Sequence, residues 1–400
     1  IFDTVNFKAP FDAGGGVPQN TYSLVGRIDF NLSNKTQMFF RAGRENQDQF
    51  NGSSFYSAYP AYDVGYSELN QSFLYSLNHT YNANMFSNTK ISFTRFNDKN
   101  SFDTALTSTP NLMIVPPTDP VTGVLLQLPG LENYGAPGEG GLPYGGPQNT
   151  WQFEHDFAWT KGRHNMRFGG QFTYLQLNVA YGAYAQAVEQ LGGTLQESLD
   201  DLTNVAGNAG GSQLVAFDAR VNPQGQLPCR TDIYGNLIPS PACAVTPPLS
   251  SADYARSYRY KDWAIYAQDS FRITPRMTIN YGLRYEHYGV QHNSDPSLDS
   301  NFYFGSGAGI EEQVRNGGVL IANKSPVGGF WKPRWGTFAP RVGFAYDVFG
   351  DGKTSLRGGF GISYERNFGN VTYNASFNPP ASAVLSSVCA ASTPGCTTLV

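Results

Sequence analysis

The chain has 400 residues, a formal net charge of −4, and only 14% charged residues against about a quarter in ordinary globular proteins. Lys and Arg are scattered singly, which argues against a nucleic-acid-binding protein, because such a protein would carry a basic face. No run of about 18 apolar residues occurs, so membrane-spanning helices are excluded.

The first predicted element is a hairpin between residues 21 and 45. Residues 1–20 are expected to be irregular, since Gly14, Gly15, Gly16 and Pro18 interrupt any regular structure. From residue 22 onward, apolar and polar side chains alternate, which puts them on opposite faces of a strand. A turn at 33–35 then returns the chain with the same alternation, so the hairpin has one apolar and one polar face.

The same pattern recurs four more times along the chain. The further turns are predicted at 82–84, 161–163, 274–276 and 350–353, and the last contains the Asp-Gly signal of hairpins. The most regular alternation lies within residues 258–290. Each strand has roughly ten residues or more, about what a tilted strand needs to cross a bilayer.

The lengths of the connections alternate as strictly as the side chains. Every second connection is a turn of roughly three to five residues, and the others run from about twenty to eighty residues. An up-and-down meander with these lengths places all short turns at one end and all long loops at the other. Outer-membrane barrels have this asymmetry and soluble sandwiches do not. The alternative is a soluble β protein with the apolar face turned inward. Within the longest connection, helical spacing at 185–204 predicts a short helix.

The fold class predicted is therefore all-β: a partial transmembrane antiparallel up-and-down β-barrel of about ten strands in five hairpins, with short periplasmic turns and long extracellular loops. The predicted organisation is an irregular lead-in over 1–20, part of the barrel over 21–366, and an extracellular loop over 367–400. The mean hydropathy of −0.35 agrees with such alternation, because averaging over both faces hides the apolar one.

Four segments carry a family resemblance: 266–271 (YAQDSF), 274–286 (TPRMTINYGLRYE), 338–347 (FAPRVGFAYD) and 356–361 (LRGGFG). They resemble the barrel of TonB-dependent outer-membrane receptors, in particular the Oar-like group, and the likeness extends over about residues 20–366. The resemblance implies a bacterial outer-membrane location and energised uptake of a scarce ligand, such as an oligosaccharide or siderophore. It implies coupling to the TonB-ExbB-ExbD complex. No enzymatic activity and no cofactor are expected, because the sequence shows no catalytic constellation.

The family's plug domain, TonB box and terminal aromatic residue have no counterpart in this sequence. About ten strands also cannot close the family's barrel of roughly 22 strands. The expectation is therefore an internal fragment of the barrel. A plug-less porin or a surface adhesin of the outer membrane remains the alternative function.

The candidate functional residues are side chains that would face the barrel lumen and aromatic side chains in the long loops. The lumen or plug-facing candidates are Arg284, Glu286, Arg341, Arg357 and Glu365. The loop aromatics that could stack on a sugar ring or a siderophore are Tyr134, Tyr144, Tyr181 and Tyr184. Tyrosines are also simply common in such loops, and the charged candidates could contact only a plug or water.

No catalytic or metal-binding pattern emerges from the sequence. His155 and His164 flank the turn at 161–163, and His155 shares the apolar face, so a girdle position is favoured there over a metal ligand. The carboxylates recur at strand period, as lumen-facing residues would. The cysteines form two sequence-local pairs, Cys229 with Cys243 and Cys389 with Cys396. Disulfides within loops of an oxidising compartment are the favoured interpretation, and free thiols are the alternative.

Overall fold

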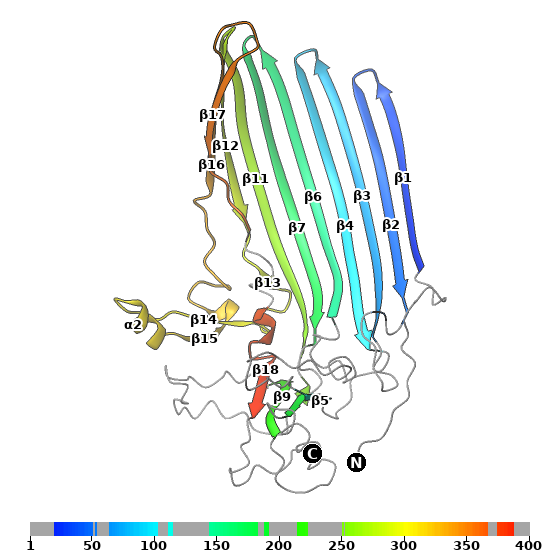
Figure 1. Ribbon diagram of the computed structural model, residues 1–400, viewed down its shortest axis with the longest axis vertical. Helices are drawn as coiled ribbons and strands as arrows, with labels where there is room; N and C mark the ends of the chain where they lie inside the picture. The colour runs from blue at the N-terminus through cyan, green and yellow to red at the C-terminus, as the bar shows by residue number, and fades with distance from the viewer. Residues whose placement is uncertain are drawn as a thin grey trace, which may run out of the picture.

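The computed structural model describes residues 20–50, 53, 64–102, 111–114, 144–182, 188–191, 214–222, 250–251, 253–366 and 374–387. Their dominant feature is one large antiparallel sheet with the strand order β1-β2-β3-β4-β6-β7-β11-β12-β16-β17 (Figure 1). The bounds are β1 (Asn20–Ser33), β2 (Thr36–Gln49), β3 (Val64–Asn82), β4 (Met85–Phe102), β6 (Tyr144–Lys161), β7 (His164–Tyr181), β11 (Ala255–Thr274), β12 (Met277–Tyr288), β16 (Phe338–Asp347) and β17 (Ser355–Gly361). The short strand β13 (His292–Asn293) pairs with the start of β11.

The strands follow one another as five hairpins, which confirms the predicted up-and-down architecture. Four turns contain two residues each, at 34–35, 83–84, 162–163 and 275–276. Gly162 has a φ of 58°, a left-handed conformation that suits glycine. In the wider last turn, the Asp347 carboxylate accepts backbone hydrogen bonds from Gly350 and Gly352, both at 2.9 Å.

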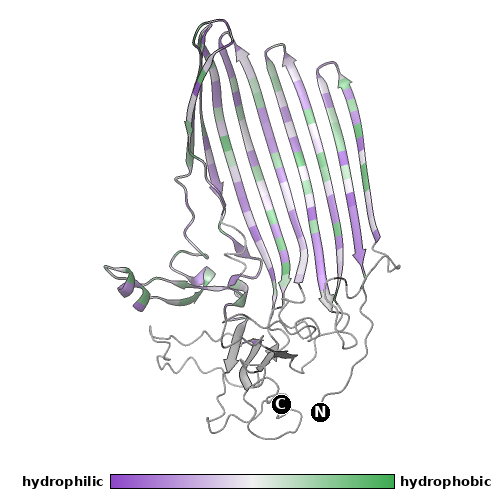
Figure 2. Cartoon of the chain, in the orientation of Figure 1, coloured by the Kyte–Doolittle hydropathy of each residue, from purple (hydrophilic) through white to green (hydrophobic). Residues whose placement is uncertain are grey.

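One face of the sheet is apolar along its whole width. Residues opposite each other in adjacent strands share a face, so the register extends each strand's alternation across the sheet. Figure 2 shows this alternation of hydrophobic and hydrophilic residues along the strands. Ile265, Leu283 and Val342 remain 56%, 46% and 53% exposed on the apolar face. Such an extended apolar surface is what a bilayer covers.

Aromatic rings join neighbouring strands on this apolar face. Phe40 lies 6.2 Å from Phe73 and Phe73 lies 6.2 Å from Phe93, measured between ring centroids. Phe93 in turn lies 4.4 Å from Trp151, so four rings connect β2, β3, β4 and β6. Cross-strand aromatic pairs of this kind contribute roughly 0.2–1 kcal/mol each relative to alanine pairs.

The long connections gather at the end of the sheet opposite the short turns (Figure 1). They contribute a small sheet in the order β10-β9-β8-β5, with β18 beside β9. The bounds are β5 (Asn111–Ile114), β8 (Val188–Leu191), β9 (Leu214–Asn222), β10 (Ser250–Ser251) and β18 (Ala383–Ser387). A hairpin of β14 (Ser300–Tyr303) and β15 (Gly318–Ile321) carries α2 (Ile310–Arg315), and two 3-10 turns, η1 (Ala322–Lys324) and η2 (Asn374–Phe377), complete the described elements.

One expectation about these connections is wrong where the structure describes it. Within the helix predicted over 185–204, the described residues 188–191 form the strand β8, because they pair with β9 and β5 instead of forming helical hydrogen bonds. Of the predicted extracellular loop at 367–400, residues 374–387 are described, and they contain β18, which also pairs with β9. No helix among the described residues is long and apolar enough to span a membrane.

A buried hydrophobic cluster lies at the long-loop end of β11. Tyr258, Tyr260, Ala322 and Phe330 form it, so the 289–337 connection packs onto the strand. Beside it, Arg256 Nε lies 3.0 Å from Asp299 Oδ1, and both side chains are 1% exposed. Burial raises the pKa of the Asp299 carboxyl, and the adjacent Arg256 guanidinium opposes that rise.

Candidate functional site: the polar concave face

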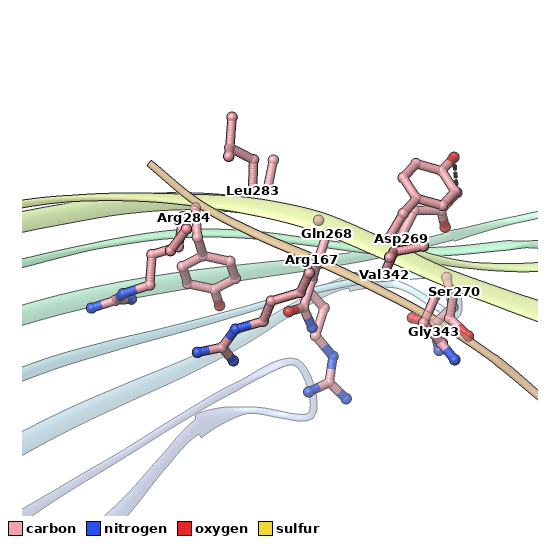
Figure 3. A pocket seen from close by; sticks show the side chains of 16 residues that line it. Arg167, Gln268, Asp269, Ser270, Leu283, Arg284, Val342 and Gly343 are labelled. Atoms are coloured by element: carbon pink, nitrogen blue, oxygen red, sulfur yellow. Dashed lines mark hydrogen bonds between the residues drawn. The ribbon is translucent and has the colours of Figure 1, made fainter. Parts of the chain in front are cut away.

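The polar face of the sheet is its concave side. Figure 3 shows Arg167, Gln268 and Arg284 pointing to the side toward which the sheet curves, and Leu283 and Asp269 pointing to the other side. The concave side would face the lumen of a barrel, and the convex, apolar side would face lipid.

A row of four residues crosses this concave face from β7 to β16. Arg167 is opposite Gln268, Gln268 is opposite Gly282, and Gly282 is opposite Arg341. A Cβ on Gly282 would lie 2.7 Å from the Gln268 Cβ, so the absence of a side chain there keeps the row open. These residues line a cavity of about 610 Å³ (Figure 3).

Of the three arginines that line this cavity, one has a carboxylate partner and two have none within the described part of the chain. Arg284, two residues along β12 from Gly282, donates from Nε to Glu286 Oε1 at 2.6 Å and from its second nitrogen to Gln171 Oε1 at 3.4 Å. Arg167 and Arg341, by contrast, take part in no ion pair within the described part of the chain. Two uncompensated guanidinium groups at one cavity favour an anionic group there.

A tyrosine–carboxylate pair borders the arginines. The Tyr266 hydroxyl donates to Asp156 Oδ1 at 2.6 Å, across Gly169 of the strand between them. A Cβ on Gly169 would lie 2.4 Å from the Tyr266 ring, so glycine is what lets the ring lie flat over β7. The pair therefore presents a rigid wall to the cavity.

Comparison with known proteins identifies the family. The sequence profile of the outer membrane beta barrel domain matches residues 6–399. The chain belongs to this outer-membrane β-barrel family. It is accordingly a protein of the bacterial outer membrane, as the sequence predicted.

Several solved structures are similar to this barrel chain at low sequence identity. The open form of the ferric-catecholate import receptor Fiu from E. coli K12 is 11% identical, with a TM-score of 0.43, and the match covers 87% of this chain and 47% of that one. The siderophore receptor PiuA from Acinetobacter baumannii is 10% identical, with a TM-score of 0.35 and coverages of 86% and 49%. The ferric enterobactin receptor PfeA from Pseudomonas aeruginosa is 9% identical, with a TM-score of 0.40 and coverages of 85% and 32%. The matches thus cover less than half the length of each of these receptors. No curated protein sequence matches this chain.

The large sheet places three of the predicted lumen residues close together and the other two apart from them. Arg284 and Arg341 line the cavity, and Glu286 lies on the same face as the hydrogen-bond partner of Arg284. Arg357 lies on the same face of β17 but opposite Ala345, and its Nε donates to Ser355 Oγ at 3.0 Å. Glu365 follows the end of β17 and is exposed.

Sequence reasoning missed Arg167, Gln268 and the pair of Tyr266 with Asp156. Each lies at a polar position of the strand alternation, which is the signal that could have identified it. Their proximity depends on the pairing of β7 with β11, two strands that a long connection separates.

Two of the four predicted loop aromatics, Tyr144 and Tyr181, lie together, but at the ends of β6 and β7 and not in loops. Tyr144 and Tyr181 face each other across β6 and β7 with ring centroids 6.2 Å apart. Tyr181 also meets Phe377 at 5.3 Å, and the Arg220 guanidinium lies 4.2 Å above the Phe377 ring. Tyr134, Tyr184 and the four cysteines Cys229, Cys243, Cys389 and Cys396 lie outside the described residues.

The histidines of the third hairpin bind neighbouring side chains. Nδ1 of His155 lies 2.8 Å from Thr89 Oγ1, and Nδ1 of His164 lies 2.6 Å from Asp269 Oδ2. Within the described ranges, no group of three or more His, Cys, Asp or Glu residues could hold a metal ion.

Proposed function

We propose that this chain forms part of the wall of a TonB-dependent outer-membrane transporter of the Oar-like group, whose concave face binds an anionic group in the lumen. The observation that carries the proposal is the pair of uncompensated arginines, Arg167 and Arg341, at one concave cavity. The family-like segments at 266–286 and 338–361 support the transporter class.

The large sheet needs further strands to close into a barrel. Among the described residues, β1 and β17 each pair on one side only. Unpaired backbone groups are prohibitive in lipid, so the membrane form must pair both edges. The ten strands of the main path are therefore proposed to be one sector of a larger barrel.

The arginines suit two anionic partners that a transporter offers. One is a carboxylate of a plug domain that fills the lumen, and the other is an anionic ligand in transit. A guanidinium binds either one through paired N–H groups, which fixes orientation as well as charge. In both cases the energy for uptake would come from the TonB-ExbB-ExbD complex acting on the plug.

Tyr144 and Tyr181 provide the proposed outer contact with the ligand. Tyr144 is 42% exposed beside Tyr181, at the long-loop end of β6 and β7. Exposed aromatic rings stack on sugar rings or catecholates. An oligosaccharide or a siderophore is therefore the proposed class of ligand.

Conductance of the full-length protein in a planar bilayer tests this function. A plugged transporter should be nearly closed, and ligand uptake by cells should disappear when TonB is deleted. A permanently open pore would instead support the plug-less porin. A closed barrel with TonB-independent adhesion of cells would support the adhesin.

A further inference from the structure

The convex face carries a polar cluster where lipid is expected, close to the short turns of the third and fourth hairpins. His164 Nδ1 lies 2.6 Å from Asp269 Oδ2, and the Tyr281 hydroxyl donates to the same oxygen at 2.8 Å. Asp269 is only 8% exposed, and its Oδ1 atom has no hydrogen-bond partner. Ionisable residues on a lipid face are costly, so their presence calls for a functional explanation.

The cluster lies at the level of an interfacial girdle. Asp269 is opposite Met166, which is opposite Trp159, so the carboxylate and the indole occupy the same rung of the sheet. Tryptophan concentrates at the boundary between the hydrocarbon and the headgroups. The cluster therefore lies where lipid headgroups begin.

Cationic groups surround the cluster on the side of the turn. Lys161 and Arg163 are exposed on either side of Gly162, and the Lys161 ammonium lies 5.3 Å from the centroid of the Trp159 ring. Neither residue forms an ion pair with any carboxylate of the described part of the chain. His164 of the cluster lies next to Arg163 in the chain, with its ring stacked on Phe271 at 4.2 Å between centroids.

An apolar trough continues from these groups toward the middle of the sheet. A cavity of about 1070 Å³ is lined at one end by Lys161, Arg163 and His164 and elsewhere by Met166, Phe168 and Leu283. Gln268, Gly282 and Arg341 of the row described above also contribute to its lining. Phe168 and Leu283 are 40% and 46% exposed. A site with a cationic end at headgroup level and an apolar body complements one amphiphilic anion.

We propose that this convex trough binds a single anionic glycerophospholipid of the leaflet at the short-turn side. Its phosphate would contact Lys161 and Arg163, and an acyl chain would lie along Phe168 and Leu283. Asp269 and Tyr281 would act as positioning residues that hold the His164 ring toward the phosphate. In outer-membrane barrels the short turns are periplasmic, so the lipid belongs to the inner leaflet.

Native mass spectrometry of the delipidated full-length protein with added dioleoyl-phosphatidylglycerol tests the site. One tightly retained lipid is expected, and Lys161→Gln with Arg163→Gln should weaken its binding by at least about tenfold, since two charge-assisted contacts are lost. The matched control is Lys35→Gln with Lys353→Gln, which removes the same charge from the turns of the first and fifth hairpins and should leave the lipid bound.

Further arms separate this lipid from other sources of phosphate. His164→Gln should weaken the adduct without disturbing the turn, which keeps the test valid if the double variant does not insert. Equal retention by the double variant and its control would overturn the proposal. Displacement of the lipid by inorganic phosphate alone, or tighter retention of lipid A than of phosphatidylglycerol, would overturn it as well.

Discussion

At the scale of single residues, Arg167 and Arg341 define the electrostatics of the concave cavity. We expect Arg167→Gln with Arg341→Gln to make the open barrel distinctly less selective for anions, because both guanidinium groups lack a carboxylate partner. The reversal potential in a potassium chloride gradient measures this, recorded on the barrel after removal of the proposed plug domain. Arg27→Gln is the control, since Arg27 is already paired with Asp29 at 2.6 Å. An unchanged reversal potential in the double variant would contradict the proposed lumen site.

Gly169 shows how one missing side chain shapes the same face. An alanine there would meet both the Tyr266 ring, 2.4 Å from the added Cβ, and Asp156 Oδ1 at 2.5 Å. We expect Gly169→Ala to break the hydrogen bond between these residues and to destabilise the barrel by about 1–3 kcal/mol, the usual cost of overpacking. The temperature at which the folded form is lost on gel electrophoresis measures the change. Gly26→Ala is the control, because nothing lies within 4 Å of its added Cβ.

At the scale of strands, the two faces should tolerate charge very differently. Leu283→Arg places a cation on the lipid-facing side of β12, which costs about 2–4 kcal/mol near the bilayer midplane. We therefore expect less protein in the outer-membrane fraction and a lower urea midpoint. Asn280→Arg, on the concave side of the same strand, is the control and should insert normally. Equal insertion of both variants would mean that the lipid-facing side has been misassigned.

The buried ion pair at the end of β11 should hold the 289–337 connection in place. Arg256→Ala leaves the Asp299 carboxylate buried and unpaired, and such losses cost about 3–5 kcal/mol. Faster cleavage within residues 291–336 by a protease added to cells is the expected result. Lys324→Ala, which removes an exposed cation from the same connection, serves as the control.

The Arg256→Ala variant should also respond to pH. Burial raises the pKa of Asp299 above its value in the unfolded chain, so the folded loop favours the protonated carboxyl. A raised carboxyl pKa gives a contribution to stability that is present at low pH and lost as the pH rises through it. Lowering the pH from about 8 to about 5 should therefore restore protection to the variant. Cleavage that does not slow on acidification would argue against this role of Asp299.

Strands and connections differ in how far the sequence determines them. Alternation along 258–290 depends on neighbouring residues, so both strands and the turn between them could be predicted. The strand at 188–191 depends on β9, which is distant in sequence, and local spacing there indicated a helix. The row from Arg167 to Arg341 likewise depends on the register between β7 and β11. A register between hairpins that a long connection separates is not encoded in local periodicity.

At the scale of the whole molecule, the two ends of the sheet should lie on opposite sides of the membrane. The short turns lie together at one end and the long connections at the other (Figure 1). Outer-membrane barrels have their short turns in the periplasm and their long loops outside the cell. The proposed ligand aromatics Tyr144 and Tyr181 would then face outward, and the phospholipid trough beside Lys161 would face the inner leaflet.

Epitope insertion tests this orientation. A short tag placed after Ser297 lies in the long-loop region, and one placed after Asp351 lies in a short turn. An antibody should bind intact cells only when the tag follows Ser297, and should bind permeabilised cells in both cases. The reverse pattern would place the aromatic cluster in the periplasm, which is incompatible with capture of an external ligand. It would also move Lys161 and Arg163 to the outer leaflet, where lipid A would replace phosphatidylglycerol as their expected partner.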